Sequence, residues 1–267
     1  MSILDTIVER TRADVATRRQ AVPLTALEAR LASARPVLPF AAALRRPDGG
    51  RPTIIAELKK ASPSKGLIRA DFAPLDLARE LAAAGAAALS VLTEPHFFQG
   101  HPDYLAAVAP VVPIPCLRKD FIVDEYQVVE ARVLGASALL LIAAALADGL
   151  YSRLFTLARE LGLGVLTEVH DEAELARVLP LGVDVVGVNS RNLKTFQVDL
   201  AVAERMLGQI PASQARIAES GVASGADMAR LVAAGADGFL VGETLMRAVS
   251  PGAALRELLA QYEACRQ

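Results

Sequence analysis

The stretch Ala84-Gly85-Ala86-Ala87-Ala88-Leu89-Ser90-Val91 joins an alanine-rich segment to an apolar run through a single glycine. A glycine at that point can adopt the left-handed conformation that ends many helices, and the β-prone run after it is typical of a buried strand. Three later stretches follow the same plan: Leu134–Leu141, Leu181–Val188 and Ala234–Val241. A unit of helix end, glycine and strand that recurs along a chain predicts a repeated architecture.

Similar apolar runs elsewhere bring the candidate strands to eight, at residues 53–58, 87–92, 112–118, 138–143, 164–168, 185–189, 216–219 and 238–241. Their spacing is roughly 20 to 36 residues, the length of a strand followed by a helix. Helical patterns lie between them, for example over residues 75–82 and 228–232. Eight such units predict an α/β fold whose parallel strands close into a (β/α)8 barrel, the TIM barrel.

The composition of the 267-residue chain suits this fold. Hydrophobic residues make up 53% of the chain, but there are only eight Phe, four Tyr and no Trp, so aliphatic side chains must fill the core. Such a core favours helices packed on a parallel sheet that is buried on both faces. We expect one domain over residues 1–267, with an N-terminal helical extension at 1–50 and the barrel at 51–267. The first twenty residues predict an amphipathic helix, because apolar residues recur at helical spacing at Ile3, Leu4, Ile7, Val8 and Val15.

The formal net charge of −2 offers no general attraction for nucleic acid or an anionic membrane, so we expect neither as a partner. The only two cysteines, Cys116 and Cys265, form no metal-type spacing, and no metal site is expected. The apolar run 138–147 is about half the length that a membrane-spanning helix needs. No targeting segment is visible at the N-terminus. We therefore expect a cytoplasmic protein, a monomer or weak homodimer, whose partner is a small molecule.

Polar residues gather where the predicted strands end, which is where barrel enzymes carry their reacting side chains. They include Glu57, Lys59, Thr93, Glu94, Lys119, Asp120, Glu168, Asn189, Ser190, Arg191, Glu219 and Ser220. Alternation along the first strand places Glu57 and Lys59 on one face, towards the barrel mouth, and Lys60 on the other. Converging ionisable groups cost desolvation free energy, so we favour a catalytic site over structural ion pairs, although ion pairing stays open for any single residue.

Glycines follow the last two predicted strands, in Glu219-Ser220-Gly221-Val222 and Val241-Gly242-Glu243-Thr244. Glycine permits close approach of the backbone, and free N–H groups at the start of a helix bind anions. We therefore predict a phosphate site in these loops rather than plain turns. Glu243 is expected to contribute only its backbone, with its carboxylate pointing away.

The three histidines and Cys116 receive structural interpretations. We place His96 and His101 in a solvated loop rather than in a metal site. His170 precedes Asp171-Glu172-Ala173-Glu174, which resembles a capping box at a helix start, so a structural role is favoured. Cys116 is interpreted as a small core residue.

These motifs resemble those of the indole-3-glycerol phosphate synthase family, from the first predicted helix to the last. The segments that carry the resemblance are Glu57–Gly66 (ELKKASPSKG), Leu89–Glu94, Phe97–Gly100, Leu117–Gln127 (LRKDFIVDEYQ), Leu166–His170, Gly187–Leu193, Ala218–Val222 and Phe239–Met246. The resemblance implies a carboxy-lyase that needs no cofactor. It implies closure of the indole ring of 1-(2-carboxyphenylamino)-1-deoxyribulose 5-phosphate, with release of carbon dioxide and water.

The resemblance also implies roles for individual residues. Lys119 matches the general acid that polarises the ketone, and Glu168 matches the other principal catalytic carboxylate. Lys59 matches a lysine that contacts the substrate and assists proton transfer, and which lysine serves which step stays open. Residues that position or tune these groups are Glu57, Asn189 and Glu219. Substrate contacts are implied for Ser62, Phe98, Phe121, Arg191 and Ser220, and phosphate contacts for Lys59, Gly221, Gly242 and Glu243. Core packing stays open for Phe121.

Two other functions remain open at this point. Lys119 could form a Schiff base in an aldolase, or the barrel could bind a sugar phosphate without catalysis. The direction in which the lysine pKa values move is also open, because burial lowers them and carboxylates raise them. Residues 62–66 predict a mobile loop over the site, in which Lys65 is either a substrate contact or a solvated charge.

Overall fold

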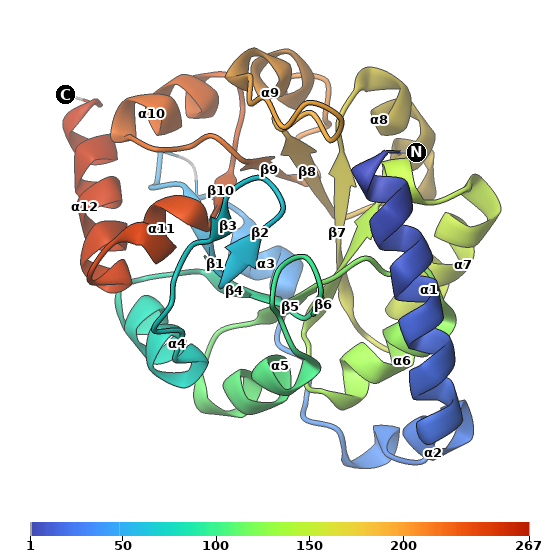
Figure 1. The fold of residues 1–267 in the computed structure, drawn as a ribbon. Helices are drawn as coiled ribbons and strands as arrows, with labels where there is room; N and C mark the ends of the chain where they lie inside the picture. Colours follow the sequence, from blue (N-terminus) through green and yellow to red (C-terminus); the bar gives the residue numbers. More distant parts are fainter. Residues whose placement is uncertain (1, 48, 267) are drawn as a thin grey trace.

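A computed structural model describes residues 2–47 and 49–266 (Figure 1). The predicted limits at 1 and 267, and position 48 of the predicted extension, lie outside the described residues. Within the described part, eight parallel strands close into a barrel in the order β1-β10-β9-β8-β7-β6-β5-β4, which confirms the (β/α)8 fold. The strands are β1 (Thr53–Leu58), β4 (Ala88–Leu92), β5 (Cys116–Lys119), β6 (Ala138–Ile142), β7 (Gly164–Val169), β8 (Val185–Asn189), β9 (Ala215–Glu219) and β10 (Gly238–Val241).

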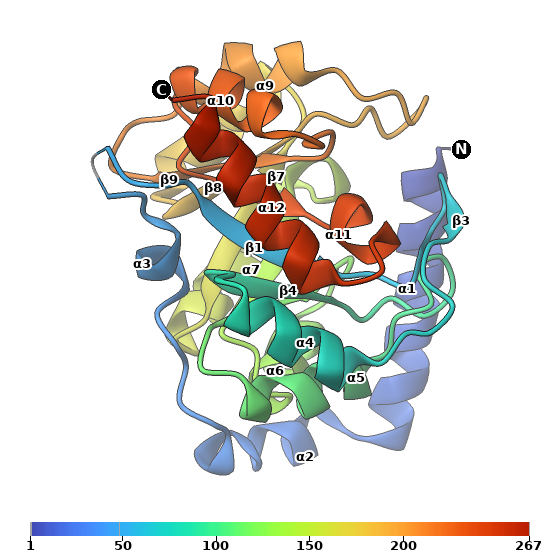
Figure 2. The ribbon, with the colours of Figure 1, turned by 90° about the vertical axis from the view of Figure 1, so that its left-hand side faces the viewer.

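Helices surround the strands on the outside of the barrel (Figure 2). The strand-to-strand connections contain α4 (Pro74–Ala83), α5 (Pro102–Val108), α6 (Glu125–Val133), α7 (Asp148–Glu160), α8 (Glu172–Val178), α9 (Leu200–Leu207) and α10 (Gly225–Ala233). After β10 come α11 (Glu243–Arg247) and α12 (Pro251–Ala264). Short 3-10 helices cover Leu31–Ser33, Ala109–Val111, Ala143–Ala145 and Leu179–Leu181. None of the helices in the described part of the chain is both long and apolar enough to span a membrane.

The glycines of the repeated stretches have the backbone conformation that the sequence predicts. Gly85, Gly135, Gly182 and Gly235 have φ values of 99°, 88°, 72° and 109°. Each lies between a helix and the next strand, where a side chain would strain a left-handed residue. The repeat therefore reflects a local requirement that is met in the same way four times.

One strand prediction is wrong at its start. We predicted a strand over 112–118, but β5 begins at Cys116. Pro113 and Pro115 each lack the N–H that a central strand must donate, and each restricts the residue before it. The other predicted strand boundaries agree with the structure to within one residue.

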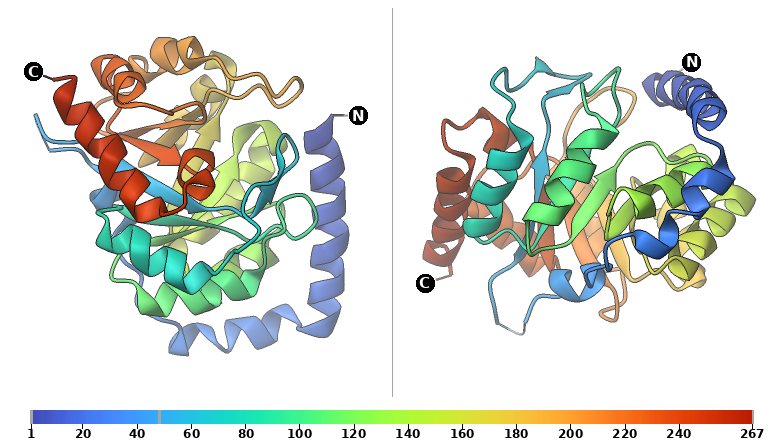
Figure 3. Two further views of the ribbon diagram at one scale, coloured as in Figure 1. Left: turned by 60° about the vertical axis from the view of Figure 1, so that its left-hand side comes forward. Right: turned by 90° about the horizontal axis from the view of Figure 1, so that it is seen from below.

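The N-terminal extension wraps one side of the barrel, and in the right view of Figure 3 its last part closes the lower end. It contains the predicted amphipathic helix as α1 (Ile3–Ala21), followed by α2 (Leu24–Glu28) and α3 (Phe40–Leu44). From α3, Phe40 and Leu44 are buried against the inward-facing side chains of the strands. This packing supports our proposal that extension and barrel form one domain. It fills the amino end of the barrel and leaves the carboxyl end for a site.

The loop after β1 holds a short antiparallel hairpin, β2 (Ala61–Ser62) with β3 (Gly66–Leu67). Residues 62–66, for which we predicted a mobile loop over the site, contain the turn of this hairpin, and their mobility stays a prediction. Gly66 has a φ of 63°, a value suited to a tight turn. In the left view of Figure 3 the hairpin stands beside α1 at the rim of the barrel.

Candidate active site

A cavity of about 580 Å³ opens at the carboxyl ends of the strands. Its volume suits a small organic ligand. All of the residues that we predicted for catalysis or binding line it: Glu57, Lys59, Ser62, Phe98, Lys119, Phe121, Glu168, Asn189, Arg191, Glu219, Ser220, Gly221, Gly242 and Glu243. Lys65 also lines the cavity, whereas Lys60 is not among the lining residues, as the alternation along β1 predicts. The structure thus brings the predicted set together, and the role of each residue stays a prediction.

Lys119 lies between two buried carboxylates at the floor of the cavity. Its Nζ donates to Glu168 Oε2 at 2.8 Å and lies 3.5 Å from Glu219 Oε2. Burial opposes the charged amine, but Glu168, Glu219 and Glu57 outweigh it and raise the pKa of Lys119 above its ordinary value. The structure therefore decides the direction of the Lys119 pKa shift, which the sequence left open. The resting cavity holds Lys119 as a cation that can polarise a bound oxygen.

Glu168 is held at both of its oxygens. Lys119 donates to Oε2, and Asn189 Nδ2 donates to Oε1 at 3.1 Å. Burial alone would raise the pKa of this carboxyl, but Lys119 and His170, together with the two hydrogen bonds, lower it below its ordinary value. Glu168 is therefore ionised at neutral pH, ready to accept a proton.

Glu219 has the opposite protonation preference. Burial raises its pKa, Lys119 opposes that effect, and Glu168 and Glu57 add to it, so that the pKa reaches about 8. Gly187 on β8 leaves room for this carboxyl, since a Cβ there would collide with Glu219 Oε1. A protonated Glu219 reduces the negative charge beside Lys119 at neutral pH, because Glu168 is then the ionised one of these two carboxyls.

Replacing Glu219 with Gln is expected to increase the free energy of unfolding at pH 9 by about 1–3 kcal/mol and to change it little at pH 4. In the wild type the folded pKa of about 8 exceeds the ordinary value of 4.5. The folded protein therefore loses stability as the pH rises through that window, and Gln does not titrate. Urea unfolding of both proteins at pH 4, 6 and 9 measures the difference. A stability difference independent of pH would contradict the raised pKa of Glu219.

Lys59 forms a second amine–carboxylate pair on the β1 side of the cavity. Its Nζ lies 2.5 Å from Glu57 Oε2. Gly242 on the neighbouring strand end accommodates this pair, since a Cβ at Gly242 would collide with the Glu57 carboxylate. Lys59 and Lys119 thus each pair with a carboxylate, at the ends of different strands.

The loops after β9 and β10 form one end of the cavity. Ser220 and Gly221 both have left-handed backbones, with φ values of 67° and 88°. A Cβ at Gly221 would collide with Val198 and Leu200 from the loop after β8 and the start of α9, so only glycine fits there. Gly242 is the N-cap residue of α11. The Glu243 carboxylate is engaged by Arg247 at 3.0 Å and by Lys65 at 3.8 Å.

Comparison with known proteins identifies the family. The family model described as indole-3-glycerol phosphate synthase matches residues 4–258. The chain belongs to the indole-3-glycerol phosphate synthase family. The relative of that name from Rhodospirillum rubrum is 51% identical over 259 residues, covering 96% of this chain and 98% of the relative. The one from Azospirillum brasilense is 50% identical over 259 residues, covering 97% of this chain and 99% of the relative.

Solved structures of other proteins share the fold. Thiamine phosphate pyrophosphorylase from Pyrococcus furiosus superposes with a TM-score of 0.62 at 14% identity, covering 85% of this chain and 98% of that chain. KGPDC from Streptococcus mutans gives a TM-score of 0.61 at 11% identity, covering 80% of this chain and 98% of that chain. At these identities the likeness concerns the barrel alone.

In this synthase-family chain, the apolar wall of the cavity is larger than the sequence indicated. The rings of Phe98 and Phe121 have centroids 6.1 Å apart, and both line the cavity, while Phe121 also packs against the barrel core. Apolar residues that we missed come from α1 and from the loop after β8: Ile3, Leu4, Ile7, Leu193, Phe196 and Val198. The amphipathic pattern of α1 was visible in the sequence, but it did not show which surface the helix contacts. Arg247, the last residue of α11, also lines the cavity and was missed.

Polar residues behind this wall hold its aromatic side chains in place. Glu94 accepts from the backbone N–H groups of His96, Phe97 and Phe98, which fixes the loop that carries the Phe98 ring. Asp120 Oδ1 accepts from the backbone N–H of Phe121. These strand-end acids were predicted to lie near the site, and the structure gives them supporting contacts.

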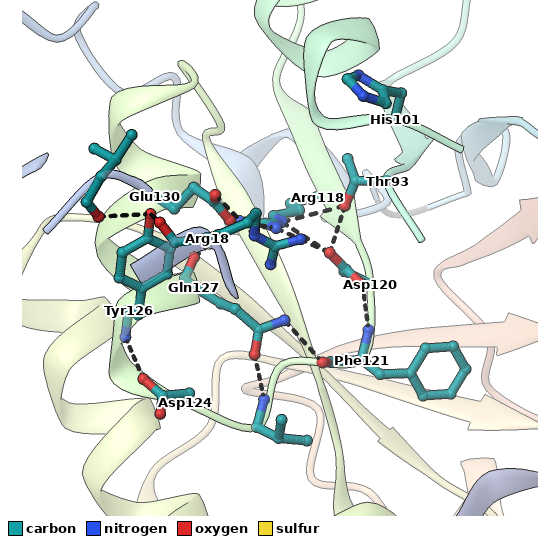
Figure 4. A network of polar contacts seen from close by, with 12 residues as sticks. Arg18, Thr93, His101, Arg118, Asp120, Phe121, Asp124, Tyr126, Gln127 and Glu130 are labelled. Carbon is teal, nitrogen blue, oxygen red and sulfur yellow. Dashed lines mark hydrogen bonds and ion pairs between the residues drawn. The ribbon is translucent and has the colours of Figure 1, made fainter. Parts of the chain in front are cut away.

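Arg118, which precedes Lys119 in β5, belongs to a buried charge network (Figure 4). Arg118 is fully buried and donates to Asp120 at 2.9 Å, while its guanidinium pairs with Glu130 of α6 at 2.7 Å. Arg18 of α1 pairs with Glu130 at 3.3 Å. The network therefore joins the cavity-lining helix α1 to the strand that carries Lys119.

The residues to which we gave structural interpretations have identifiable contacts. His96 lies 2.7 Å from Asp14 of α1, and His101 accepts from the N–H of Asp103 as the N-cap of α5. Cys116 is buried in the core. The capping box after β7 is half correct, because Asp171 caps α8 by accepting from Glu174 N, but the Glu174 side chain turns to His170 instead.

Proposed function

We propose that this chain closes the indole ring of 1-(2-carboxyphenylamino)-1-deoxyribulose 5-phosphate, releasing carbon dioxide and water, as expected for its family. The observation that carries the proposal is the Lys119–Glu168 pair, buried between an apolar wall and a glycine-rich end in one cavity. A binding protein would not need two lysine–carboxylate pairs at the cavity floor, since each costs desolvation free energy.

The distribution of charged and apolar residues in the cavity favours one orientation of the substrate. We place its phosphate against Ser220, Gly221, Gly242 and the backbone of Glu243, with Lys59 and Arg191 near its polar atoms. Its aromatic ring then lies along Phe98 and Phe121, with Ser62 at the rim. An apolar surround destabilises the ionised carboxylate and favours its loss as neutral carbon dioxide.

Ring closure requires an acid at the ketone. The ring carbon that bears the carboxylate attacks the ketone carbon, and Lys119 donates a proton to the ketone oxygen, which becomes a hydroxyl group. Loss of carbon dioxide then returns an electron pair to the ring and restores its aromaticity. A cation held by Glu168 and Glu219 stabilises the charge that develops on the oxygen.

Dehydration requires a second acid and a base. The hydroxyl group leaves as water after it accepts a proton, and we assign that donation to the Lys59–Glu57 pair, which is separate from the Lys119 pair. Glu168, ionised at neutral pH, takes the proton that is lost as the indole double bond forms. Asn189 and Glu219 orient and tune Glu168 and Lys119.

The direct test is turnover of the synthetic substrate by the purified protein in the presence of EDTA. We expect a fluorescent indole product, and a folded sample without turnover would contradict the proposal. Borohydride trapping with the substrate tests the aldolase alternative. We expect no adduct, because Lys119 is held protonated, whereas a reduced adduct on Lys119 would favour a Schiff base.

We further propose a cytoplasmic monomer or weak homodimer, as the sequence led us to expect. The observation that favours a self-sufficient chain is that all the predicted site residues belong to one cavity of one chain. Light scattering across a concentration series measures the oligomeric state, and a stable higher oligomer would contradict the proposal.

A further inference from the structure

His170 stands directly behind Glu168 and is absent from the set of residues that line the cavity. It follows β7 two residues after Glu168, so both side chains project from the same face of the strand. His170 Nε2 lies 3.4 Å from Glu168 Oε1. Nε2 is buried and has no hydrogen-bond partner among the described residues.

The other side of the imidazole ring is held by Glu174 of α8. Glu174 Oε2 lies 3.3 Å from His170 Nδ1 and accepts from the His170 backbone N–H at 2.8 Å. The ring is therefore clamped between two carboxylates, with Nδ1 towards Glu174 and Nε2 towards Glu168. The backbone hydrogen bond alone would suffice to fix the turn, so it does not explain why the side chain is histidine.

The titratable groups that face His170 are acids: Glu168 of β7, Glu174 of α8 and Glu219 of β9. Burial opposes the charged ring, but Glu174 and Glu168 outweigh it and raise the pKa of His170 above its ordinary value. Lys119 contacts Glu168 at the opposite oxygen, Oε2, and so lies on the cavity side. A neutral ring with a buried, unpartnered nitrogen would cost free energy, and a charged ring turns the same nitrogen into a donor for Glu168.

We propose that His170 is a positioning residue for Glu168. As an imidazolium clamped by Glu174, it stabilises the ionised form of Glu168 and directs Oε1, leaving Oε2 for Lys119 and the substrate. The inference deepens the proposed function, because it rests on Glu168 acting as the base. It assigns chemistry to a residue that the sequence alone suggested was structural.

The test compares His170→Leu and His170→Gln with wild type. His170→Leu is expected to lower kcat about tenfold and to move the acid limb of the kcat–pH profile up by about one pH unit, with KM changed less than twofold. His170→Gln retains a neutral donor towards Glu168 and is expected to recover part of the lost kcat. Glu174→Gln, which removes the clamp but keeps the histidine, is expected to shift the profile in the same direction.

A measurement independent of turnover separates this inference from the proposed function. Carbon-13 NMR of the labelled glutamate side chains follows the titration of Glu168 directly, and we expect its pKa to rise in His170→Leu. His101→Leu, at an exposed histidine of the α5 cap, is the matched control and should leave both readouts unchanged. If His170→Leu fails to fold, the pH profile and the Glu168 titration are measured on His170→Gln and Glu174→Gln instead. An unchanged Glu168 pKa and an unmoved pH profile would overturn the inference, whereas an inactive wild type would overturn only the proposed function.

Discussion

Replacing Lys119 with Met is expected to lower kcat by at least about 10³-fold while the barrel stays folded. Met keeps most of the side-chain volume but removes the proton donor and the cation that faces the ketone oxygen. Glu168 and Glu219 then lose their shared partner, which lies 2.8 and 3.5 Å away in the wild type. We expect these carboxyls to retain protons to higher pH, so the loss of stability should be small at pH 6 and larger at pH 9.

Single-turnover kinetics and thermal unfolding measured on the same sample check this prediction. Lys60→Met is the matched control, since Lys60 belongs to the same lysine-rich segment but is not among the cavity-lining residues. That variant should keep wild-type turnover. Near-normal activity of Lys119→Met would show that the proton for ring closure comes from elsewhere, with Lys59 as the next candidate.

Replacing Glu168 with Gln is expected to lower kcat by about 10²–10³-fold with little change in KM. The amide keeps the shape of the side chain and can still accept from Lys119, but it cannot take up the proton that dehydration releases. Because the wild-type pKa of Glu168 is lowered by Lys119 and His170 against the effect of burial, its carboxylate is ionised at neutral pH. The variant therefore loses a base that is present in the resting enzyme.

Analysis of the accumulated material distinguishes this effect from general damage. A block at dehydration predicts that Glu168→Gln forms carbon dioxide in a single turnover before indole fluorescence appears. Glu172→Gln, at a half-exposed acid on α8, is the control and should behave as wild type. Simultaneous loss of decarboxylation and fluorescence in Glu168→Gln would instead place this residue in ring closure.

The barrel could be predicted because its signals are local. A glycine with positive φ must end each repeated helix, and an apolar run must follow it to form a strand buried on both faces. The one strand that was misplaced, β5, also has a local explanation, since prolines at 113 and 115 prevent pairing before Cys116. The sequence also predicted that Glu57 and Lys59 share one face and that Lys60 lies on the other, because side chains alternate along any strand.

The sequence predicted the site residues that lie at strand ends. It missed those that reach the cavity because a distant helix packs on the barrel. Ile3, Leu4 and Ile7 lie on a helix whose apolar face was evident from the sequence. That face could have packed against any of the outer helices. Periodicity shows which face of a helix is apolar, but it does not show which element that face contacts. The Arg18–Glu130 ion pair, through which α1 reaches the Arg118 network of β5, joins residues more than 100 positions apart.

By itself, the sequence of this chain determined the element order, the closed parallel barrel and the identity of the ionisable residues at its mouth. These features depend on neighbouring residues and on a rule that brings all strand ends to one rim. Only the tertiary structure decided the protonation states. Lys119 and His170 are raised in pKa, Glu168 is lowered and Glu219 is raised. The physical reason is that each pKa is the balance of burial against charges a few ångströms away on other strands, and those distances are set by the folded barrel.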